Sequence, residues 1–147
     1  MEDNLNDHPS GDEQVNLAKQ YFRKVDAGDP SLLDLFADDA QAFFPRFGIA
    51  HGKAEFISLV QGLNGAVSRF DHDENLMIFT QAGNRVAVEG IETGTLTDGT
   101  PFPGDARSAG HFCNVFEFRG SLISRLHIYA DPNFTGDHPD LFRWENA

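Results

Sequence analysis

The hydrophobic pattern of this chain changes its period near residue 67, and this change limits the folds that it can adopt. Before that point, most apolar side chains recur three and four positions apart, which is the spacing of one face of an α-helix. From Val67 onward the spacing is that of β-strands. Helices first and a meander of strands after them are typical of the α+β class, with a curved and mostly antiparallel sheet.

Three segments carry helix signals. Ser10 and Glu13 have the spacing of a capping box, and Gly28 is a natural stop, so the first helix should lie between them. Asp29 and Pro30 should then start a short helix, and a third is expected over residues 53–63. The expected buried faces are, in chain order, Leu17, Ala18, Tyr21, Phe22 and Val25, then Leu32, Leu33, Leu35 and Phe36, then Phe56, Ile57, Val60 and Leu63.

Strands are predicted between turn signals. Pro45 should interrupt a short strand over residues 42–47 and keep it at the periphery. The acidic stretch at residues 71–74 should bend a long extended run over residues 67–81. Further strands are expected over residues 85–96, 111–118 and 122–131, with a loop at residues 101–104.

Length and composition exclude several classes of protein. The 147 residues suit one domain, expected over residues 10–147 after a flexible acidic tail over residues 1–9. The 14 Phe residues indicate an aromatic core or an apolar cavity. A net charge of -12 disfavours binding to nucleic acid or to an anionic membrane. Cys113 is the only cysteine, and neither a signal peptide nor a membrane span is apparent, so we expect a cytoplasmic protein without an internal disulfide.

The strand expected over residues 111–118 is apolar on both faces. Phe112, Phe116 and Phe118 share one face, and Cys113 and Val115 share the other. Such a sheet needs a cover on each side. The helices can supply one cover and a second copy of the chain could supply the other, so we predict a homodimer.

The last predicted strand combines an apolar and a polar face. The apolar side consists of Leu122, Leu126 and Ile128, and the polar side of Arg125, His127, Tyr129 and Asp131. A carboxylate at the end of a buried strand is costly unless it is paired or neutralised. Asp131 is therefore a candidate general acid or base; the alternative is an edge strand with a solvated face that ends in an Asp-Pro turn.

Other polar residues are weaker candidates. His72 interrupts a strand and could face inward beside Phe70, although a lone strand histidine is often structural. Glu89 and Glu92 are three positions apart on one predicted strand, so at most one should enter a pocket. Tyr21 could offer its hydroxyl to that pocket or simply belong to the core.

The sequence lacks the short motifs of metal sites, phosphoryl transfer and serine hydrolysis. It contains no HExxH motif, no His-x-His pair and no cysteine set for a metal. It also contains no glycine-rich phosphate loop and no nucleophile elbow. Phosphoryl transfer and serine hydrolysis are therefore not expected.

Several stretches, taken with the order of elements, carry a family resemblance. They are Tyr21-Phe22, residues 35–40 (LFADDA), His51-Gly52, residues 86–90 (VAVEG), residues 115–118 (VFEF) and residues 123–131. The chain resembles the nuclear transport factor 2-like superfamily, in its SnoaL-like polyketide cyclase and ketosteroid isomerase branch. The resemblance implies a cone-shaped, cystatin-like barrel, with a strongly curved sheet wrapped around the N-terminal helices and an apolar pocket. It also implies dimers formed through the outer sheet face.

The resemblance implies a chemistry as well. Such a protein would be an enzyme without metal or organic cofactor that moves protons on a small apolar or polycyclic molecule, as an isomerase, cyclase, dehydratase or epoxide hydrolase. Asp131, His127 and His72 would be its catalytic residues. The pocket would be lined by Tyr21, Phe44, Phe70, Glu89, Asn114, Phe116 and Tyr129. The alternative is a non-catalytic ligand-binding or dimerisation module of the same fold.

Overall fold

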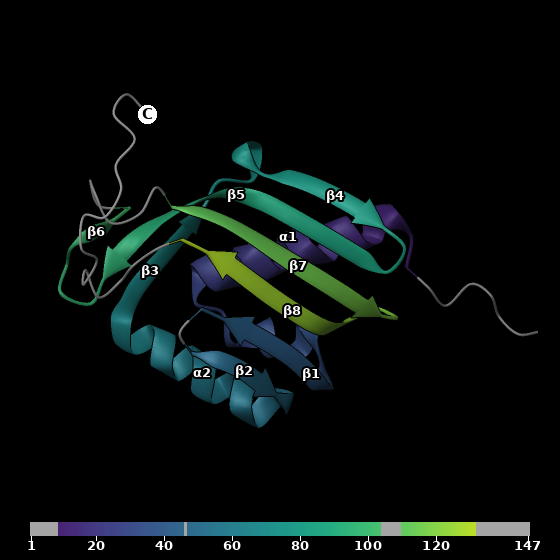
Figure 1. Ribbon diagram of the computed structural model, residues 1–147, viewed down its shortest axis with the longest axis horizontal. Helices are drawn as coiled ribbons and strands as arrows, with labels where there is room; N and C mark the ends of the chain where they lie inside the picture. The colour runs from purple at the N-terminus through teal and green to yellow at the C-terminus, as the bar shows by residue number, and fades with distance from the viewer. Residues whose placement is uncertain (1–8, 46, 104–109, 132–147) are drawn as a thin grey trace, which may run out of the picture.

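The computed structural model describes residues 9–45, 47–103 and 110–131, in which a curled sheet is packed on helices (Figure 1). The first helix, α1 (Gly11–Ala27), begins with the predicted capping box. Ser10 Oγ accepts the backbone N–H of Glu13, and the Glu13 carboxylate accepts that of Ser10, both at 3.2 Å. Gly28 ends the helix with a φ of 62°, a left-handed conformation that glycine adopts without strain. Most of the predicted tail and all residues after 131 lie outside the described residues.

The segment after α1 differs most from its prediction. A 3₁₀-helix, η1 (Pro30–Leu35), is capped by Asp29 as expected, and β1 (Phe36–Phe44) follows it directly. β1 is not peripheral, because it lies between β2 (Gly48–His51) and β8 (Leu122–Ala130) in the sheet. The prediction of a peripheral strand over residues 42–47 is therefore wrong. Pro45 lies beyond the end of β1 and does not interrupt it.

The rest of the chain follows the predicted order. Helix α2 (Gly52–Ala66) extends the predicted helix by a few residues. The predicted bend separates β3 (Val67–His72) from β4 (Ile78–Ala82), with a 3₁₀-turn η2 (Glu74–Leu76) between them. The remaining strands are β5 (Arg85–Leu96), the short β6 (Pro101–Phe102) and β7 (His111–Arg119).

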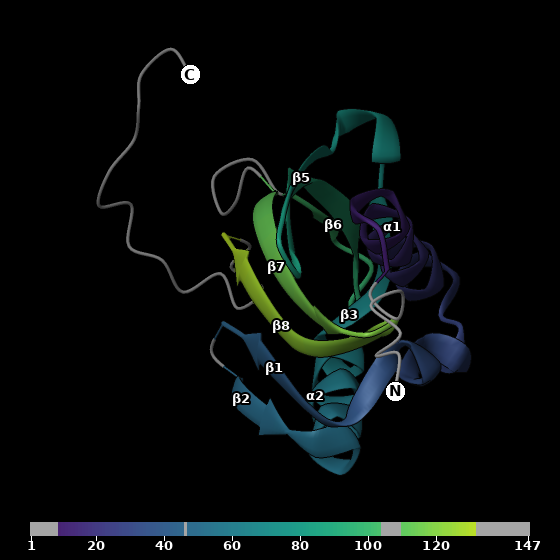
Figure 2. The ribbon, with the colours of Figure 1, turned by 90° about the vertical axis from the view of Figure 1, so that its right-hand side faces the viewer.

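The sheet of the described residues runs in the order β2-β1-β8-β7-β5-β3, and β4 and β6 also pair with β5. Only β1 and β8 run parallel among the described pairs. The sheet curls around an interior that α1 and α2 close from one side (Figures 1 and 2). The largest fully buried side chains are Phe22, Phe36, Phe116, Ile123, Leu126, Val86 and Val88. The architecture confirms the expected α+β fold with a curved, mostly antiparallel sheet.

A β-bulge changes which residues of β8 face the interior. The register between β7 and β8 shifts after Glu117, so that Ile123 and Leu126 are both fully buried although they are three positions apart. Leu122, expected on the apolar face, is 39% exposed. The prediction for Leu122 is therefore wrong, because strict alternation holds only without a bulge.

Candidate active site

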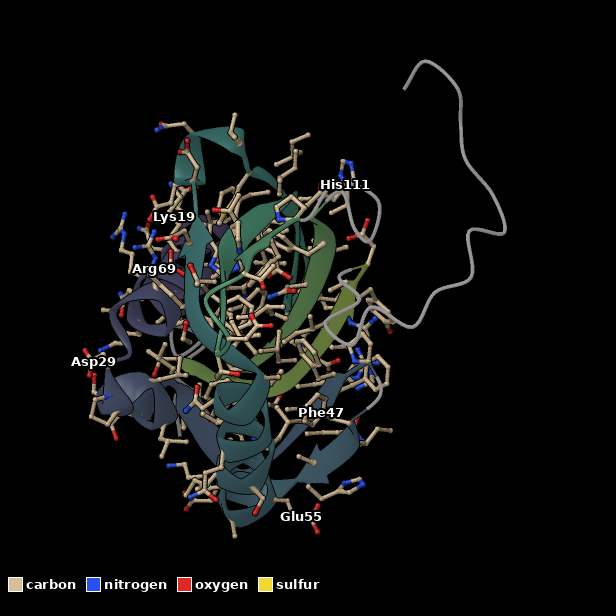
Figure 3. The ribbon with its side chains drawn as sticks, turned by 90° about the vertical axis from the view of Figure 1, so that its left-hand side faces the viewer. Lys19, Asp29, Phe47, Glu55, Arg69 and His111 are labelled. Atoms are coloured by element: carbon tan, nitrogen blue, oxygen red, sulfur yellow. The ribbon has the colours of Figure 1, made fainter. Side chains whose placement is uncertain are left out.

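His72, the last residue of β3, lies in an aromatic environment inside the curl of the sheet. Its side chain is only 5% exposed. The Phe22 ring of α1 lies 5.0 Å from the imidazole centre and the Phe112 ring of β7 lies 5.3 Å from it. Phe70 stacks on the imidazole at 6.1 Å. Figure 3 shows side chains filling the space between β3, α2 and the strands opposite, while Arg69 points away from it.

Two carboxylates hold the His72 ring. Oδ1 of Asp26, in the last turn of α1, lies 2.5 Å from Nδ1, and its Oδ2 accepts the backbone N–H of His72 at 2.8 Å. Oε2 of Glu92 lies 3.2 Å from Nε2, because the β3–β5 register pairs His72 with Glu92. We call these three residues the His72 cluster.

The carboxylates determine the charge of the imidazole. Burial alone would lower the pKa of His72, but the hydrogen bonds and charges of Asp26 and Glu92 outweigh it and raise this pKa to about 9. At neutral pH the ring is therefore an imidazolium, and both of its N–H groups donate to carboxylates.

Two buried oxygens of the interior remain without a partner among the described residues. They are Oε1 of Glu92 and Oδ1 of Asn114, on residues that are 5% and 4% exposed. Buried polar atoms are seldom left in this state, because an unmade hydrogen bond costs about 1–3 kcal/mol. They are therefore the two unsatisfied buried side-chain acceptors in the described part of the interior.

Tyr21 of α1 adds a phenol to this interior. The residue is 7% exposed, and its ring meets Phe116 edge to face at 5.2 Å. Burial, followed by the charges of Glu92 and Asp26, raises the pKa of Tyr21. The hydroxyl therefore stays protonated at neutral pH and is a hydrogen-bond donor.

The residues predicted to line the pocket divide between the two faces of the sheet. Tyr21, Phe44, Asn114 and Phe116 are buried on the interior side, and Phe70 is half-buried there beside His72. Glu89 and Tyr129 lie on the outer face, where Cys113 pairs with both. As the spacing of three predicted, Glu89 and Glu92 take opposite faces, and it is Glu92 that faces the interior.

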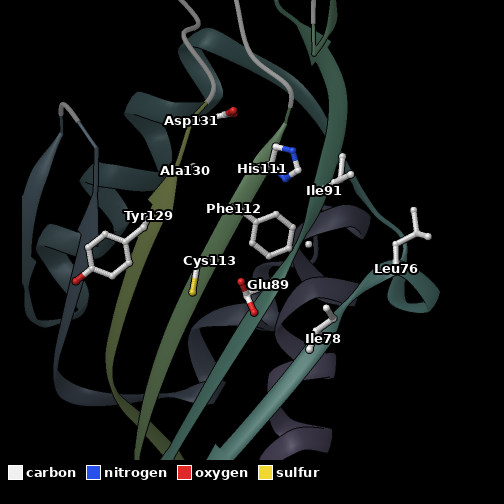
Figure 4. Close-up of a pocket in the computed structure, with 11 residues that line it drawn as sticks. Leu76, Ile78, Glu89, Ile91, His111, Phe112, Cys113, Tyr129, Ala130 and Asp131 are labelled. Atoms are coloured by element: carbon white, nitrogen blue, oxygen red, sulfur yellow. The ribbon is translucent and has the colours of Figure 1, made fainter. Parts of the chain in front are cut away.

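The other two predicted catalytic residues also belong to the outer face. Asp131 is exposed and lines an open hollow of about 590 Å³, together with Glu89, Cys113 and Tyr129 (Figure 4). His127 bonds to Gln41 Oε1 at 2.9 Å and lies 3.0 Å from the Arg125 guanidinium. Partial burial and the charge of Arg125 lower the pKa of His127. The polar side of β8 thus faces away from the His72 cluster.

Asp26 was missed by the sequence analysis, although the sequence contains a signal for it. Ala18, Phe22 and Asp26 are spaced by four positions, so a carboxylate continues the buried stripe of α1. Such a carboxylate needs a buried partner.

Within the described ranges, no group of three or more His, Cys, Asp and Glu side chains is placed to hold a metal ion. None of the helices described is long and apolar enough to cross a membrane.

Comparison with known proteins gives the family. The family model for SnoaL-like domains matches residues 18–126, which is most of the chain. The chain belongs to the SnoaL-like family. No curated protein matches this SnoaL-like chain.

Solved structures share the fold of the SnoaL-like chain. A nuclear transport factor 2-like protein from Burkholderia xenovorans LB400 is 25% identical, with a TM-score of 0.64, and the match covers 83% of this chain and 92% of that one. A candidate polyketide cyclase from Xanthomonas campestris pv. campestris is 21% identical, with a TM-score of 0.66 and coverage of 81% and 90%. TerC, co-crystallised with polyporic acid, is 16% identical, with a TM-score of 0.67 and coverage of 81% and 92%.

Proposed function

We propose that this chain is a small-molecule enzyme whose acid/base chemistry takes place at the His72 cluster. The observation that carries the proposal is a hydrogen-bonded chain of half-buried Asp26 and buried His72 and Glu92, which ends in a carboxylate oxygen without a partner among the described residues. Titratable groups with perturbed pKa values in an apolar interior are typical of catalytic sites.

The two hydrogen bonds of the imidazolium suggest different roles for Asp26 and Glu92. Asp26 accepts hydrogen bonds from both the ring and the backbone N–H of His72, so it fixes the orientation of the ring. The contact from Nε2 to Glu92 is longer, at 3.2 Å, so the Nε2 proton is the one that His72 would deliver to a substrate oxygen. Oε1 of Glu92 would accept the proton taken from substrate carbon or from water.

The reaction would be one that needs proton transfer: isomerisation, aldol-type cyclisation, dehydration or epoxide opening. The phenol of Tyr21 would donate to a developing oxyanion. The candidate polyketide cyclase of the same fold and the binding of polyporic acid by TerC support a small cyclic substrate.

The proposal is tested by turnover. Purified protein is incubated with small cyclic β-hydroxy ketones, β,γ-unsaturated ketones and epoxides, and products are followed by absorbance and mass spectrometry. For any substrate that is turned over, Asp26→Asn, His72→Gln and Glu92→Gln should each lower kcat by about 10²–10⁴-fold.

His127→Gln and Asp131→Asn are the matched controls, because they change the same residue types on the outer face. Both should keep turnover within about twofold of the parent protein. Loss of turnover in Asp131→Asn with retention in Glu92→Gln would move the acid/base role to the end of β8 and refute the proposal.

We further propose that the outer sheet face forms a homodimer. Ile78, Ile91 and Tyr129 leave 62%, 39% and 50% of their surface exposed on this face. Apolar side chains grouped on one face favour a protein partner. Sedimentation should give a dimer for the parent protein and a monomer for Ile78→Glu with Tyr129→Glu; a monomeric parent protein would contradict the proposal.

A further inference from the structure

We infer that two reciprocal ion pairs set the register of two copies of this chain, with Arg125 of each copy entering the hollow around Glu89 of the other. The inference rests on the proposed homodimer and names the contacts that hold it. It starts from one positive and one negative side chain of the outer sheet face, neither of which has an ion-pair partner among the described residues.

Arg125 of β8 is the one arginine in the described part of the chain without a carboxylate partner. The other described arginines pair with Glu74, Asp71, Glu117 and Asp39. Nη2 of Arg125 donates to Nδ1 of His127 at 3.0 Å, which leaves the other N–H groups of the guanidinium available. Glu117 lies opposite Arg125 on β7, but its carboxylate is bound to Arg85 at 3.1 Å. In a chain with a net charge of -12, such an arginine indicates a carboxylate from outside.

Glu89 of β5 has the opposite charge and lies in the hollow of about 590 Å³ on the same face (Figure 4). Its side chain is exposed, and no described lysine or arginine pairs with it. Ile78, Cys113 and Tyr129 also line the hollow. A cation that enters it would be partly shielded from water, which strengthens its attraction to the carboxylate. An aromatic wall suits a guanidinium in particular, because this planar cation stacks on aromatic rings.

The two charges are placed symmetrically about Val115, in the middle of β7. Cys113 of β7 pairs with Glu89 on one side, and Glu117 of β7 lies opposite Arg125 on the other side. Two strand spacings and four residues along the strand put Glu89 and Arg125 about 16 Å apart, with Val115 midway between them.

A twofold axis relates two such faces when it runs between them over Val115, at right angles to the line from Glu89 to Arg125. It exchanges the two positions, so that Arg125 of each copy faces Glu89 of the other. A small cation in the hollow would neutralise Glu89 alone and would leave Arg125 without a carboxylate. A second copy satisfies both charges at once, and it also covers the exposed Ile78 and Tyr129.

Charge reversal tests the inference by sedimentation velocity. Glu89→Arg and Arg125→Glu should each be monomeric, because each change brings like charges together at both contacts. An equimolar mixture of the two variants should form a heterodimer. One chain then carries two positive charges at these positions and the other carries two negative charges, so both ion pairs are restored.

Neutral variants and a matched control accompany the reversals. Glu89→Gln and Arg125→Gln should each raise the Kd of the dimer at least about tenfold, and they decide the question if a reversed variant fails to fold by circular dichroism. Arg85→Gln changes an arginine of the same face that already pairs within its own chain, so its dimer Kd should stay within about twofold of the parent value.

A dimer that survives both charge reversals, or a mixture of two folded reversed variants that stays monomeric, would overturn the inference. Unchanged dimer affinity in both folded glutamine variants would do so as well. These results would leave the homodimer itself in place, whereas a monomeric parent protein would remove both. Glu89 and Arg125 lie on the opposite side of the sheet from the His72 cluster, so turnover there is tested separately.

Discussion

Asp26 binds His72 at two points, with one carboxylate oxygen 2.5 Å from Nδ1 and the other 2.8 Å from the backbone nitrogen. These bonds join the end of α1 to the end of β3, which are 46 residues apart in the sequence. The imidazole is thereby fixed in both position and charge.

The charge of His72 can be measured directly. We expect its pKa to be about 9 in proton NMR of the imidazole Cε1–H, and to fall in Asp26→Asn because a charged acceptor is lost. His127 is the internal control, and its pKa should lie below the ordinary 6.5, since partial burial and Arg125 oppose its protonation. A His72 resonance that titrates at or below 6.5 would contradict the assignment.

Stability should fall as the pH rises from about 6.5 to about 9. The folded state raises the pKa of His72 from 6.5 to about 9, so within this window it binds more protons than the unfolded state. The contribution of His72 is complete below pH 6.5 and is lost as the pH passes through 9, with a total on the order of 3 kcal/mol. Urea unfolding of the parent protein and of His72→Gln at several pH values checks this.

The His72→Gln variant serves as the comparison in the urea-unfolding experiment. His72→Gln should show little pH dependence in the same window, whereas His127→Gln should retain the parent slope. A parent protein whose free energy of unfolding is constant or rises between pH 6.5 and 9 would show that His72 is not held as an imidazolium.

The two glutamates of β5 should behave differently. Glu92→Gln should lower turnover by about 10²–10⁴-fold, because it removes the acceptor beside His72. Glu89→Gln should leave kcat within about twofold, because Glu89 is exposed on the outer face. Steady-state kinetics of both variants decide the point, and equal losses would argue against an interior site.

Gly94 of β5 should not tolerate a side chain. A Cβ atom there would overlap the backbone oxygen of Arg69 and lie 2.5 Å from the Phe102 ring. We expect Gly94→Ala to lower the free energy of unfolding by about 3 kcal/mol, since neither neighbour can yield cheaply.

Gly65, near the end of α2, is the matched control because nothing lies within 4 Å of its Cβ position. Gly65→Ala should raise stability by about 0.5–1 kcal/mol through helix propensity. Urea unfolding measures both variants, and a neutral Gly94→Ala would show that β3 and β6 pack less closely than described.

The elements that were predicted correctly depend on local chemistry. The capping box at Ser10, the stop at Gly28 and the turn between β4 and β5 all act over a few residues. The buried position of β1 depends instead on pairing with β8, about 80 residues later, and no local pattern around Pro45 reveals it.

Local sequence patterns likewise predict only part of the candidate site. His72 and the opposite faces of Glu89 and Glu92 could be predicted from strand parity. That Asp26 reaches His72 depends on how α1 crosses the sheet, which is a tertiary property. The polar side of β8 was expected to face the interior. Which side of a strand is interior, however, depends on the face of the sheet against which the helices pack.

The parallel pairing of β1 with β8 has a consequence for how the chain is made. β8 is the only described strand that joins the β1–β2 hairpin to β7 and the rest of the sheet. On the ribosome, the sheet must therefore remain in two pieces until residues 122–130 have emerged. Such late, long-range closure favours slow folding and leaves both edges of the gap exposed to chaperones during translation.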